Sequence, residues 1–252
     1  FELPIAAGIC VIMGQVFALG RFAPIQVTVQ AFFAVFCISS SILVMNDVID
    51  IETDRVNAPG RPLPAQLVSP LEATILSLVL LAIGLVLGYV INIATFVSAV
   101  VLAAVGYLYN RRFKKTGLPG NLMVSVSVGM TFIFGGMSVG SYFHPLVWLF
   151  GIIAALIDLG EEIAADAMDA EGDLLIGSQS LAIRYGSRAA LRVSAALFSL
   201  VILLTALPFL NDWLPGVYAV PILIMDSIIA CCTLLLVRAK GFEGRNYIRW
   251  LY

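Results

Sequence analysis

Charged residues are scarce in this sequence. Only 12% of the 252 residues are Asp, Glu, Lys or Arg, whereas 61% are hydrophobic and the mean hydropathy is +1.02. A soluble domain carries about twice that share of charge, so the composition predicts a polytopic membrane protein. The formal net charge of −2 supplies no basic field for nucleic acid, and no nucleic-acid partner is expected.

Cysteine and histidine are also rare. All four cysteines lie in apolar runs without CxxC spacing, so we expect small buried hydrophobes rather than disulfides or a thiolate metal site. They are Cys10, Cys37, Cys231 and Cys232. A single histidine, His144, cannot build a metal site by itself, and we expect it to fill a short loop.

The start of the chain has no basic leader and no small-residue cleavage pattern. No cleavable signal peptide is therefore expected. Because the chain begins inside an apolar run, we expect residue 1 to be a truncation point.

Long apolar runs fill most of the chain. A helix needs roughly 20 apolar residues to span a bilayer. Eight such runs predict an all-α transmembrane bundle, and the closing segment NYIRWLY predicts the start of a ninth span. The eight expected spans cover residues 3–20, 25–45, 71–91, 93–110, 120–140, 145–165, 189–209 and 215–237.

Basic residues gather on one side of the expected bundle. Successive spans end on alternate sides of the membrane. The loops after the odd-numbered spans contain one basic residue, Arg21. The positive-inside rule therefore predicts that the basic side is cytoplasmic, in a multi-pass protein of the cell membrane. The basic loops contain Arg55, Arg61, Arg111, Arg112, Lys114, Lys115, Arg184, Arg188, Arg238, Lys240 and Arg245.

Two acidic clusters on the basic side share the spacing DxxDxxxD. The first contains Asp47, Asp50 and Asp54, and the second contains Asp166, Asp169 and Asp173. Positions i, i+3 and i+7 of a helix lie on one face, so each cluster is expected to point three carboxylates in one direction. The clusters end the second and the sixth spans, four helices apart and in the same orientation.

This spacing predicts one transmembrane domain over residues 1–252 with a parallel internal repeat. The basic loops YNRRFKKTG and VRAKGFEGR follow the fourth and the eighth spans, which agrees with two four-helix units. We expect the repeats to cover residues 1–118 and 119–245 around a shared central cavity.

The carboxylates predict a divalent cation. Six carboxylates gathered without cations would be strongly unfavourable, although a solvated helix end is the alternative interpretation. Hard oxygen ligands suit Mg²⁺ or Ca²⁺, and Mg²⁺ typically joins a few carboxylates to substrate phosphates. Together with the basic loops, the clusters predict a Mg²⁺–diphosphate site at the membrane surface, with a lipid tail among the helices.

At these residues the sequence resembles the UbiA superfamily of intramembrane prenyltransferases. NDVIDIETD matches the family motif NDxxDxxxD through Asn46, Asp47, Asp50 and Asp54. DAEGD matches the second motif, DxxxD, through Asp169 and Asp173, with Asp166 one turn earlier. The resemblance covers essentially the whole chain, and the short first and ninth helices are attributed to truncation.

The resemblance implies transfer of a prenyl group from an allylic diphosphate, with release of pyrophosphate. The six motif aspartates would be the catalytic residues and hold Mg²⁺, which neutralises charge on the leaving diphosphate. Arginine would bind phosphate oxygens in a bidentate manner and lysine as a point charge. The substrate-binding candidates are Asn46, Arg61, Tyr109, Arg111, Lys114, Lys115, Asn121 and Glu162.

Some roles have more than one interpretation. The faces of Tyr107, Tyr109 and Phe132 are candidates for stabilising an allylic cation, with ordinary packing as the alternative. Glu162, one turn before Asp166, would orient ligands or act as a base. Asp226, inside the eighth span, is either functional or a polar contact within the bundle.

The acceptor is inferred from weaker signals. The short spacer DRVNAPGRPLP and the segments LGEEIAADAMDAEGD and YNRRFKKTGLPGN resemble the archaeal ether-lipid branch, the digeranylgeranylglyceryl phosphate synthases. The chain departs from that branch at Glu161, where arginine is common. The resemblance implies geranylgeranyl transfer from geranylgeranyl diphosphate to geranylgeranylglyceryl phosphate. An aromatic acceptor, such as a hydroxybenzoate or a chlorophyllide-like ring, is the alternative.

Two other classes fit less well. CDP-alcohol phosphotransferases need DG and AR elements between their aspartates, and neither motif here has them. A divalent-cation transporter would place ionisable groups near the bilayer midplane, whereas both clusters are expected at one surface.

Overall fold

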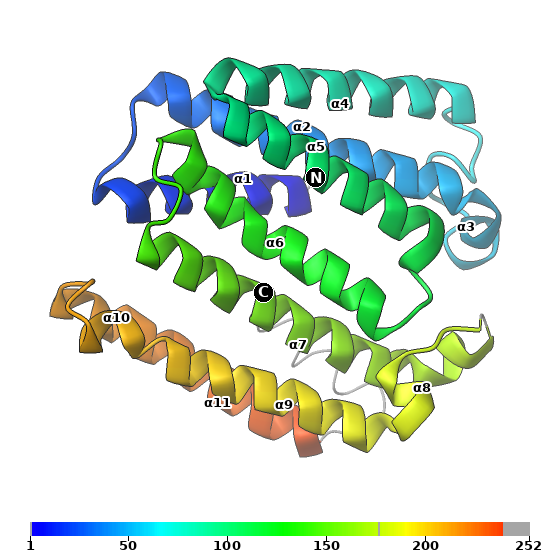
Figure 1. Ribbon diagram of the computed structural model, residues 1–252. Coiled ribbons are helices and arrows are strands. Elements are labelled where there is room, and N and C mark those ends of the chain that lie inside the picture. The colour runs from blue at the N-terminus through cyan, green and yellow to red at the C-terminus, as the bar shows by residue number, and fades with distance from the viewer. Residues whose placement is uncertain (1, 176, 239–252) are drawn as a thin grey trace. The chain divides into compact units, whose positions relative to one another are not determined.

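The computed structural model describes residues 2–175 and 177–238, except the side chains of residues 171–173 and 175. The described residues are helical and contain no β-strand (Figure 1). The segment NYIRWLY, expected to begin a ninth span, lies outside the described residues, as do Lys240 and Arg245.

The helices are α1 (Glu2–Leu19), α2 (Ile25–Ile49), α3 (Ile51–Asn57), α4 (Pro70–Ile91), α5 (Ile93–Leu108), the π-helix η1 (Tyr109–Phe113), α6 (Leu118–Ser138), α7 (Pro145–Leu175), α8 (Leu181–Tyr185), α9 (Ser187–Leu204), α10 (Leu207–Leu210), the 3₁₀-helix η2 (Gly216–Tyr218) and α11 (Ala219–Arg238).

The predicted all-α membrane bundle is confirmed. Among the described residues, seven segments are long and apolar enough to cross a membrane: α1, α2, α4, α5 with η1, α6, α9 with α10, and η2 with α11. The remaining expected span corresponds to α7, which has 31 residues. Its first eighteen residues include Asp158, Glu161 and Glu162. A count of eight spans therefore stays a prediction.

The chain divides into two compact units, which are described separately. The first comprises residues 1–112 and 130–148, and the second comprises residues 113–129 and 149–252. The units contain different acidic motifs, and α6 and α7 each contribute to both units. The predicted internal repeat stays a prediction.

In the first unit, α2 packs against α1, α4 and α5 (Figure 1). The core is built from small and branched side chains, including Val11, Ala31 and Ala34, which are fully buried. Glycines allow the closest approaches: a Cβ atom at Gly14 would lie 2.1 Å from the carbonyl oxygen of Phe132. Close packing of backbones through small residues is typical of membrane helices.

Polar side chains join the helices next to the first acidic motif. The Tyr107 hydroxyl lies 2.7 Å from Ser41 Oγ and 2.8 Å from Ser77 Oγ, so it links α5 to α2 and α4. One turn later, the buried Asn110 donates from Nδ2 to the carbonyl oxygen of Ile42 at 3.0 Å. These contacts hold the end of α5 and the start of η1 against the turn of α2 that precedes Asn46.

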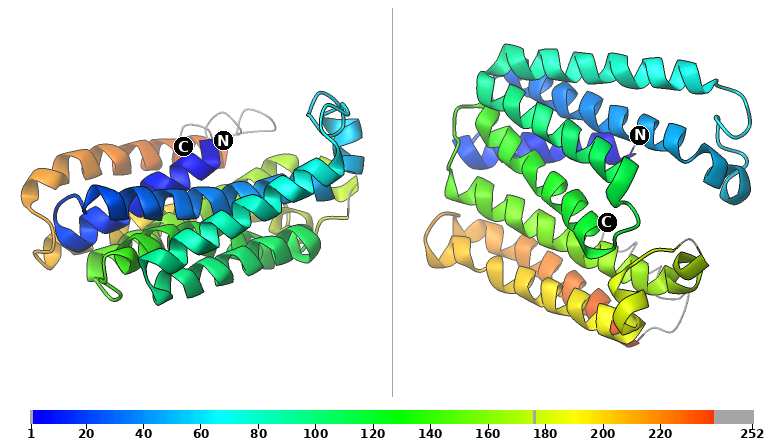
Figure 2. Two further views of the ribbon diagram at one scale, coloured as in Figure 1. Left: turned by 90° about the horizontal axis from the view of Figure 1, so that it is seen from above. Right: turned by 45° about the vertical axis from the view of Figure 1, so that its right-hand side comes forward.

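In the second unit, α7 and α9 share a core with α11, and α9 runs beside α11 (Figures 1 and 2). Gly160 permits the α7–α9 contact, since a Cβ atom there would lie 2.8 Å from the Phe198 ring. Ser194 Oγ donates to the Gly160 carbonyl oxygen at 2.7 Å. The fixed contact with α9 supports the part of α7 that leads into the second motif.

A tight turn fixes the loop between η1 and α6. Gly117 has φ +69°, and a Cβ atom there would lie 2.3 Å from the carbonyl oxygen of Gln179. This left-handed conformation and close approach both favour glycine. The Gln179 amide donates to the Lys115 carbonyl oxygen at 3.1 Å. The basic loop is therefore tied to the loop that follows α7.

Candidate functional site

The first acidic motif lies at a break between two helices. Helix α2 ends at Ile49, and α3 begins at Ile51. Asp50, at the junction, has φ −89° and ψ 3° and donates from its amide to the Asn46 carbonyl oxygen at 2.9 Å. The Asp54 amide in turn donates to the Asp50 carbonyl oxygen at 2.8 Å. The hydrogen-bond spacing of an α-helix continues across the break, but the motif is not on one uninterrupted helix.

Arg61 joins the aspartates of this motif. Its Nη1 donates to Asp54 Oδ2 at 2.7 Å and lies 3.4 Å from Asp47 Oδ1. The hydrogen bond with Asp54 raises the pKa of the Arg61 guanidinium, and the charges of Asp54, Asp47 and Asp50 act in the same direction. The structure therefore brings the Arg61 guanidinium into contact with the carboxylates of Asp47 and Asp54.

A hydrogen-bonded loop presents Arg61. The Arg61 amide donates to the Ala58 carbonyl oxygen at 3.0 Å, and the Arg61 carbonyl oxygen accepts from Ala65 at 2.9 Å. The loop ends where Ser69 and Glu72 form a capping box at the start of α4. Such a box satisfies amides that the first helical turn leaves unpaired. The backbone of the RPLP segment is thus held in place on both sides of Arg61.

The second motif lies on an unbroken helix. Helix α7 runs through Asp166 and Asp169, as expected, whereas the side chain of Asp173 lies outside the described residues. Asn121 on α6 donates from Nδ2 to Asp166 Oδ2 at 2.9 Å. Asn121 is only 7% exposed. Its hydrogen bond therefore positions an aspartate of the second motif, while the predicted substrate contact stays a prediction.

Sequence reasoning missed a further pair of polar residues. Ser125, one turn after Asn121, lies with its Oγ 2.8 Å from Asp158 Oδ2. Asp158 precedes Glu162 by four residues and Asp166 by eight. At 3.6 residues per turn, this spacing places all three on one face of α7. The spacing of four residues between these acidic side chains could have indicated their common face. Asp158 was overlooked because it lies within the expected apolar span 145–165.

The remaining predicted site residues lie in η1, in the loop between η1 and α6, and near the end of α2. Tyr109, half-buried, and Arg111, exposed, belong to η1 in the first unit. Lys114 and Lys115 are exposed and belong to the second unit. Asn46 lies on α2 one residue before Asp47. The roles of these residues in binding stay predictions.

Two aromatic candidates have packing contacts that account for their positions. The Tyr107 hydroxyl is hydrogen-bonded between Ser41 and Ser77. The Phe132 ring stacks on Phe17 with centroids 6.3 Å apart. These contacts favour the packing interpretation for both residues.

The donors in the motifs fit a hard divalent cation. They are carboxylate oxygens, the ligands that Mg²⁺ prefers, and a guanidinium already provides positive charge at Asp47 and Asp54. Among the described side chains, no three of His, Cys, Asp or Glu converge closely enough to form a preformed metal site. Mutual repulsion of carboxylates opposes such convergence without a cation. The six-aspartate ligand set stays a prediction.

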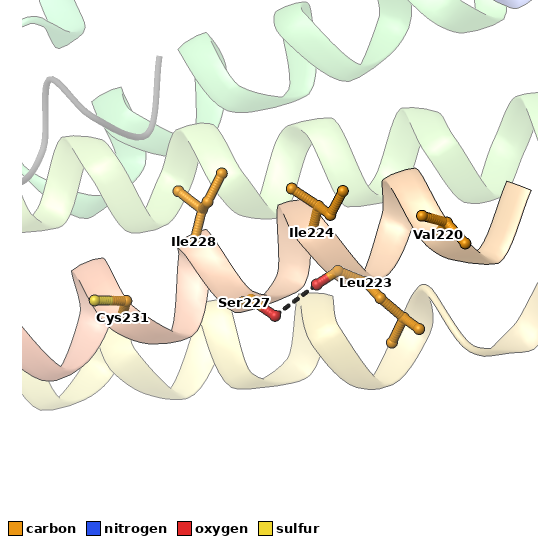
Figure 3. A pocket seen from close by; sticks show the side chains of 6 residues that line it. All are labelled: Val220, Leu223, Ile224, Ser227, Ile228 and Cys231. Atoms are coloured by element: carbon orange, nitrogen blue, oxygen red, sulfur yellow. Dashed lines mark hydrogen bonds between the residues drawn. The ribbon is translucent and has the colours of Figure 1, made fainter.

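A shallow groove lies on α11, in the second unit. Figure 3 shows its apolar lining, and the Ser227 hydroxyl in it donates to the Leu223 carbonyl oxygen of the same helix at 2.7 Å. The lining residues are Val220, Leu223, Ile224, Ser227, Ile228 and Cys231. None of them is a predicted site residue.

Two expectations from the sequence concern residues on α11, namely the burial of its cysteines and the role of Asp226. Cys231 is exposed and Cys10 is half-buried, so burial was predicted wrongly for Cys231, whereas Cys37 and Cys232 are buried. Apolar runs that face lipid leave their side chains exposed in the protein itself. Asp226 Oδ2 accepts from Thr205 Oγ1 at 2.8 Å, which favours a polar contact within the bundle.

Comparisons with known proteins agree with the motifs. Residues 7–242 match the model of the UbiA prenyltransferase family. The digeranylgeranylglyceryl phosphate synthase of Methanopyrus kandleri is 36% identical over 239 residues, which cover 95% of this chain and 87% of the relative. The synthase of the same name from Methanocaldococcus jannaschii is 35% identical over 245 residues, covering 97% of this chain and 85% of the relative.

Solved structures show the same fold. A structure described as giving structural and mechanistic insights into digeranylgeranylglyceryl phosphate synthase in membranes has a TM-score of 0.83 and 32% identity, and the match covers 99% of this chain and 89% of that one. A UbiA homologue from Aeropyrum pernix K1 has a TM-score of 0.85 at 18% identity over 99% of this chain and 94% of that one. A UbiA homologue from Archaeoglobus fulgidus bound to DMAPP and Mg²⁺ has a TM-score of 0.73 at 18% identity over 98% and 94% of the two chains. This chain therefore belongs to the UbiA prenyltransferase family, a family of multi-pass membrane enzymes.

Proposed function

We propose that this protein transfers a geranylgeranyl group from geranylgeranyl diphosphate to geranylgeranylglyceryl phosphate, with release of pyrophosphate, in ether-lipid synthesis. The observation that carries the proposal is the junction of α2 and α3, where Arg61 contacts Asp47 and Asp54 on either side of Asp50 in the motif. Acidic and basic groups that meet at the end of an apolar helix suit a lipid with a diphosphate head. The names of the relatives support the choice of acceptor.

The metal in this proposal is Mg²⁺. Its ligands would come from Asp47, Asp50, Asp54, Asp166, Asp169 and Asp173. When bound, Mg²⁺ supplies positive charge that stabilises the leaving diphosphate. The fold neighbour from Archaeoglobus fulgidus binds Mg²⁺ together with DMAPP, which agrees with this assignment.

The residues of the chain bind and orient the diphosphate. Arg61 and Arg111 would contact its oxygens in a bidentate manner, and Lys114 and Lys115 would add point charges. Asn46 would bind a diphosphate oxygen or orient Asp47. Asn121 donates to one oxygen of Asp166 and would thereby orient this carboxylate in the site.

The transfer itself replaces one carbon–oxygen bond by another. The allylic carbon–oxygen bond breaks, and its electron pair leaves with the pyrophosphate. The hydroxyl oxygen of the acceptor then bonds to the allylic carbon and loses its proton, for which Glu162 is our candidate acceptor. The apolar helices exclude the water that would otherwise capture the allylic cation.

We also propose that the site faces the cytoplasm of a cell whose membrane this protein spans. The basic loops after the even-numbered expected spans support this orientation. Both substrates would then enter with their charged heads at the cytoplasmic surface and their prenyl chains among the helices.

An acceptor panel tests the proposal. Detergent-purified protein receives labelled geranylgeranyl diphosphate and Mg²⁺ with geranylgeranylglyceryl phosphate, 4-hydroxybenzoate or a chlorophyllide, each with an EDTA control. We expect EDTA-sensitive label in the glyceryl product alone. Label in an aromatic product would overturn the acceptor. No transfer to any acceptor by folded protein would overturn the proposed function.

A further inference from the structure

Arg61 contacts the same atoms that the proposed function assigns to a metal. Its Nη1 lies 2.7 Å from Asp54 Oδ2 and 3.4 Å from Asp47 Oδ1. A metal ion bound by these oxygens and a guanidinium bound to them would exclude one another. Arg61 is also the residue we assign to the diphosphate, so one side chain has two competing partners.

We propose that Arg61 is an internal counter-ion, which competes with Mg²⁺ for Asp47 and Asp54 and moves to the diphosphate when substrate binds. Metal and prenyl diphosphate then bind cooperatively, because the diphosphate removes the competitor of the metal. This inference rests on the proposed function, since it assumes that the motif binds a Mg²⁺–diphosphate.

The charges of the motif explain why a counter-ion is needed. Three carboxylates at i, i+3 and i+7 repel one another unless a cation offsets them. Asp54 is only 9% exposed, and a buried carboxylate needs a partner. The Arg61 guanidinium supplies that partner, so it stabilises the motif before any ligand binds.

A nearby ion pair provides a contrast. Arg55 Nη1 lies 2.8 Å from Glu52 Oε1, and the two side chains are 52% and 82% exposed. This pair lies between residues three apart on α3 and involves no aspartate of the motif. Arg55 therefore carries the same charge as Arg61, in the same segment, without occupying the proposed ligand atoms.

The geometry of the loop allows the exchange. The Arg61 backbone is held by the hydrogen bonds to Ala58 and Ala65, whereas its side chain is half-exposed. The guanidinium can therefore turn away from the aspartates by side-chain rotation, without a rearrangement of the loop. A planar guanidinium fits phosphate oxygens in a bidentate manner, so the diphosphate is a suitable second partner.

Binding of metal in the absence of substrate tests the proposal. The full chain, purified in detergent, is titrated with Mn²⁺ alone, and unbound Mn²⁺ is measured by electron paramagnetic resonance. We expect Arg61→Gln to bind Mn²⁺ about two- to fivefold more tightly than the wild type, the range that loss of a partly exposed ion pair implies. Arg55→Gln, the matched control, should bind Mn²⁺ as the wild type does.

A second titration follows the diphosphate. With a non-transferable geranylgeranyl thiodiphosphate, the wild type should show mutual tightening of Mn²⁺ and analogue, as linkage requires. This tightening should be smaller in Arg61→Gln. Arg61→Lys, which keeps the charge without the planar fork, should bind Mn²⁺ alone nearly as the wild type does and bind the analogue more weakly.

Several results would overturn the inference. One is that Arg61→Gln binds Mn²⁺ no more tightly than the wild type does. Another is that Arg55→Gln binds Mn²⁺ more tightly by the same factor as Arg61→Gln. If Arg61→Gln does not fold, as judged by its melting curve, the Arg61→Lys variant decides: loss of its binding to Mn²⁺ alone would contradict the counter-ion role. Failure of the wild type to transfer a prenyl group would reject the proposed function itself, a result that these titrations do not depend on.

Discussion

The amide of Asn121 on α6 donates a hydrogen bond to one carboxylate oxygen of Asp166 on α7, with 2.9 Å between Nδ2 and Oδ2. Both residues belong to the second unit, and Asn121 is buried. This hydrogen bond fixes the orientation of an aspartate in the second motif. Residues that orient metal ligands commonly influence a site nearly as much as the ligands themselves.

Asn121→Ala should therefore lower prenyl transfer about 10- to 100-fold, because Asp166 loses its orienting donor. The dependence of the rate on Mg²⁺ concentration should shift upward in the same variant. Asn211→Ala is the matched control, since Asn211 donates to a carbonyl oxygen of its own helical turn at an exposed position. An unchanged Mg²⁺ dependence in Asn121→Ala would contradict the positioning role.

Asp50→Asn and Asp169→Asn test the two motifs separately. Each variant removes the charge of a proposed Mg²⁺ ligand, and we expect turnover to fall about 100-fold or more with little change in the melting temperature. Asp212→Asn, in the loop after α10, should retain full activity. Near-normal turnover in both purified motif variants would refute the assignment of the site.

Tyr107→Phe separates packing from a role in chemistry. The phenylalanine ring keeps the aromatic face but loses the hydroxyl that links Ser41 and Ser77. We expect a loss of about 1 kcal/mol in the free energy of unfolding and unchanged turnover. Thermal unfolding in detergent and a transfer assay on the same sample measure both. A large loss of turnover at unchanged stability would favour a direct role for the hydroxyl.

Asp226→Asn tests whether the carboxyl inside α11 matters for function. The amide can still accept the hydrogen bond from Thr205, so stability and turnover should both stay close to the wild type. Asp226→Leu should lower the melting temperature, because it removes the acceptor. Loss of activity in Asp226→Asn, with the protein folded, would assign this residue a functional role.

Hydropathy was sufficient to predict the long helices of the fold, but not its short elements. The long apolar runs predicted the spanning helices, whose ends shift by a few residues where polar residues continue a helix, as in α2 through Asn46. Hydropathy carries no signal for α3, for the π-helix η1 or for the break at Asp50. These features depend on tertiary contacts, such as the hydrogen bond from Asn110 to Ile42.

The sequence predicts the motifs of the candidate site, and their roles stay predictions, whereas it predicts few of the contacts that the structure shows around them. The DxxDxxxD spacing made the aspartates candidates, and Arg61 became a candidate as a basic residue of the loop that follows the first motif. Spacing alone could not show that Arg61 bonds to Asp54, since the two are separated by a loop. The hydrogen bond between Ser125 and Asp158 was missed because both residues stand in segments interpreted as apolar spans.

The most direct test of the account is a balance of products in one purified sample. Labelled geranylgeranyl diphosphate, geranylgeranylglyceryl phosphate and Mg²⁺ are incubated with the wild type, and the ether product and pyrophosphate are both quantified, with and without EDTA. We expect equal amounts of the two products, their loss in EDTA and their recovery when excess Mg²⁺ is added. Pyrophosphate without the ether product, or transfer that persists in EDTA, would contradict the account.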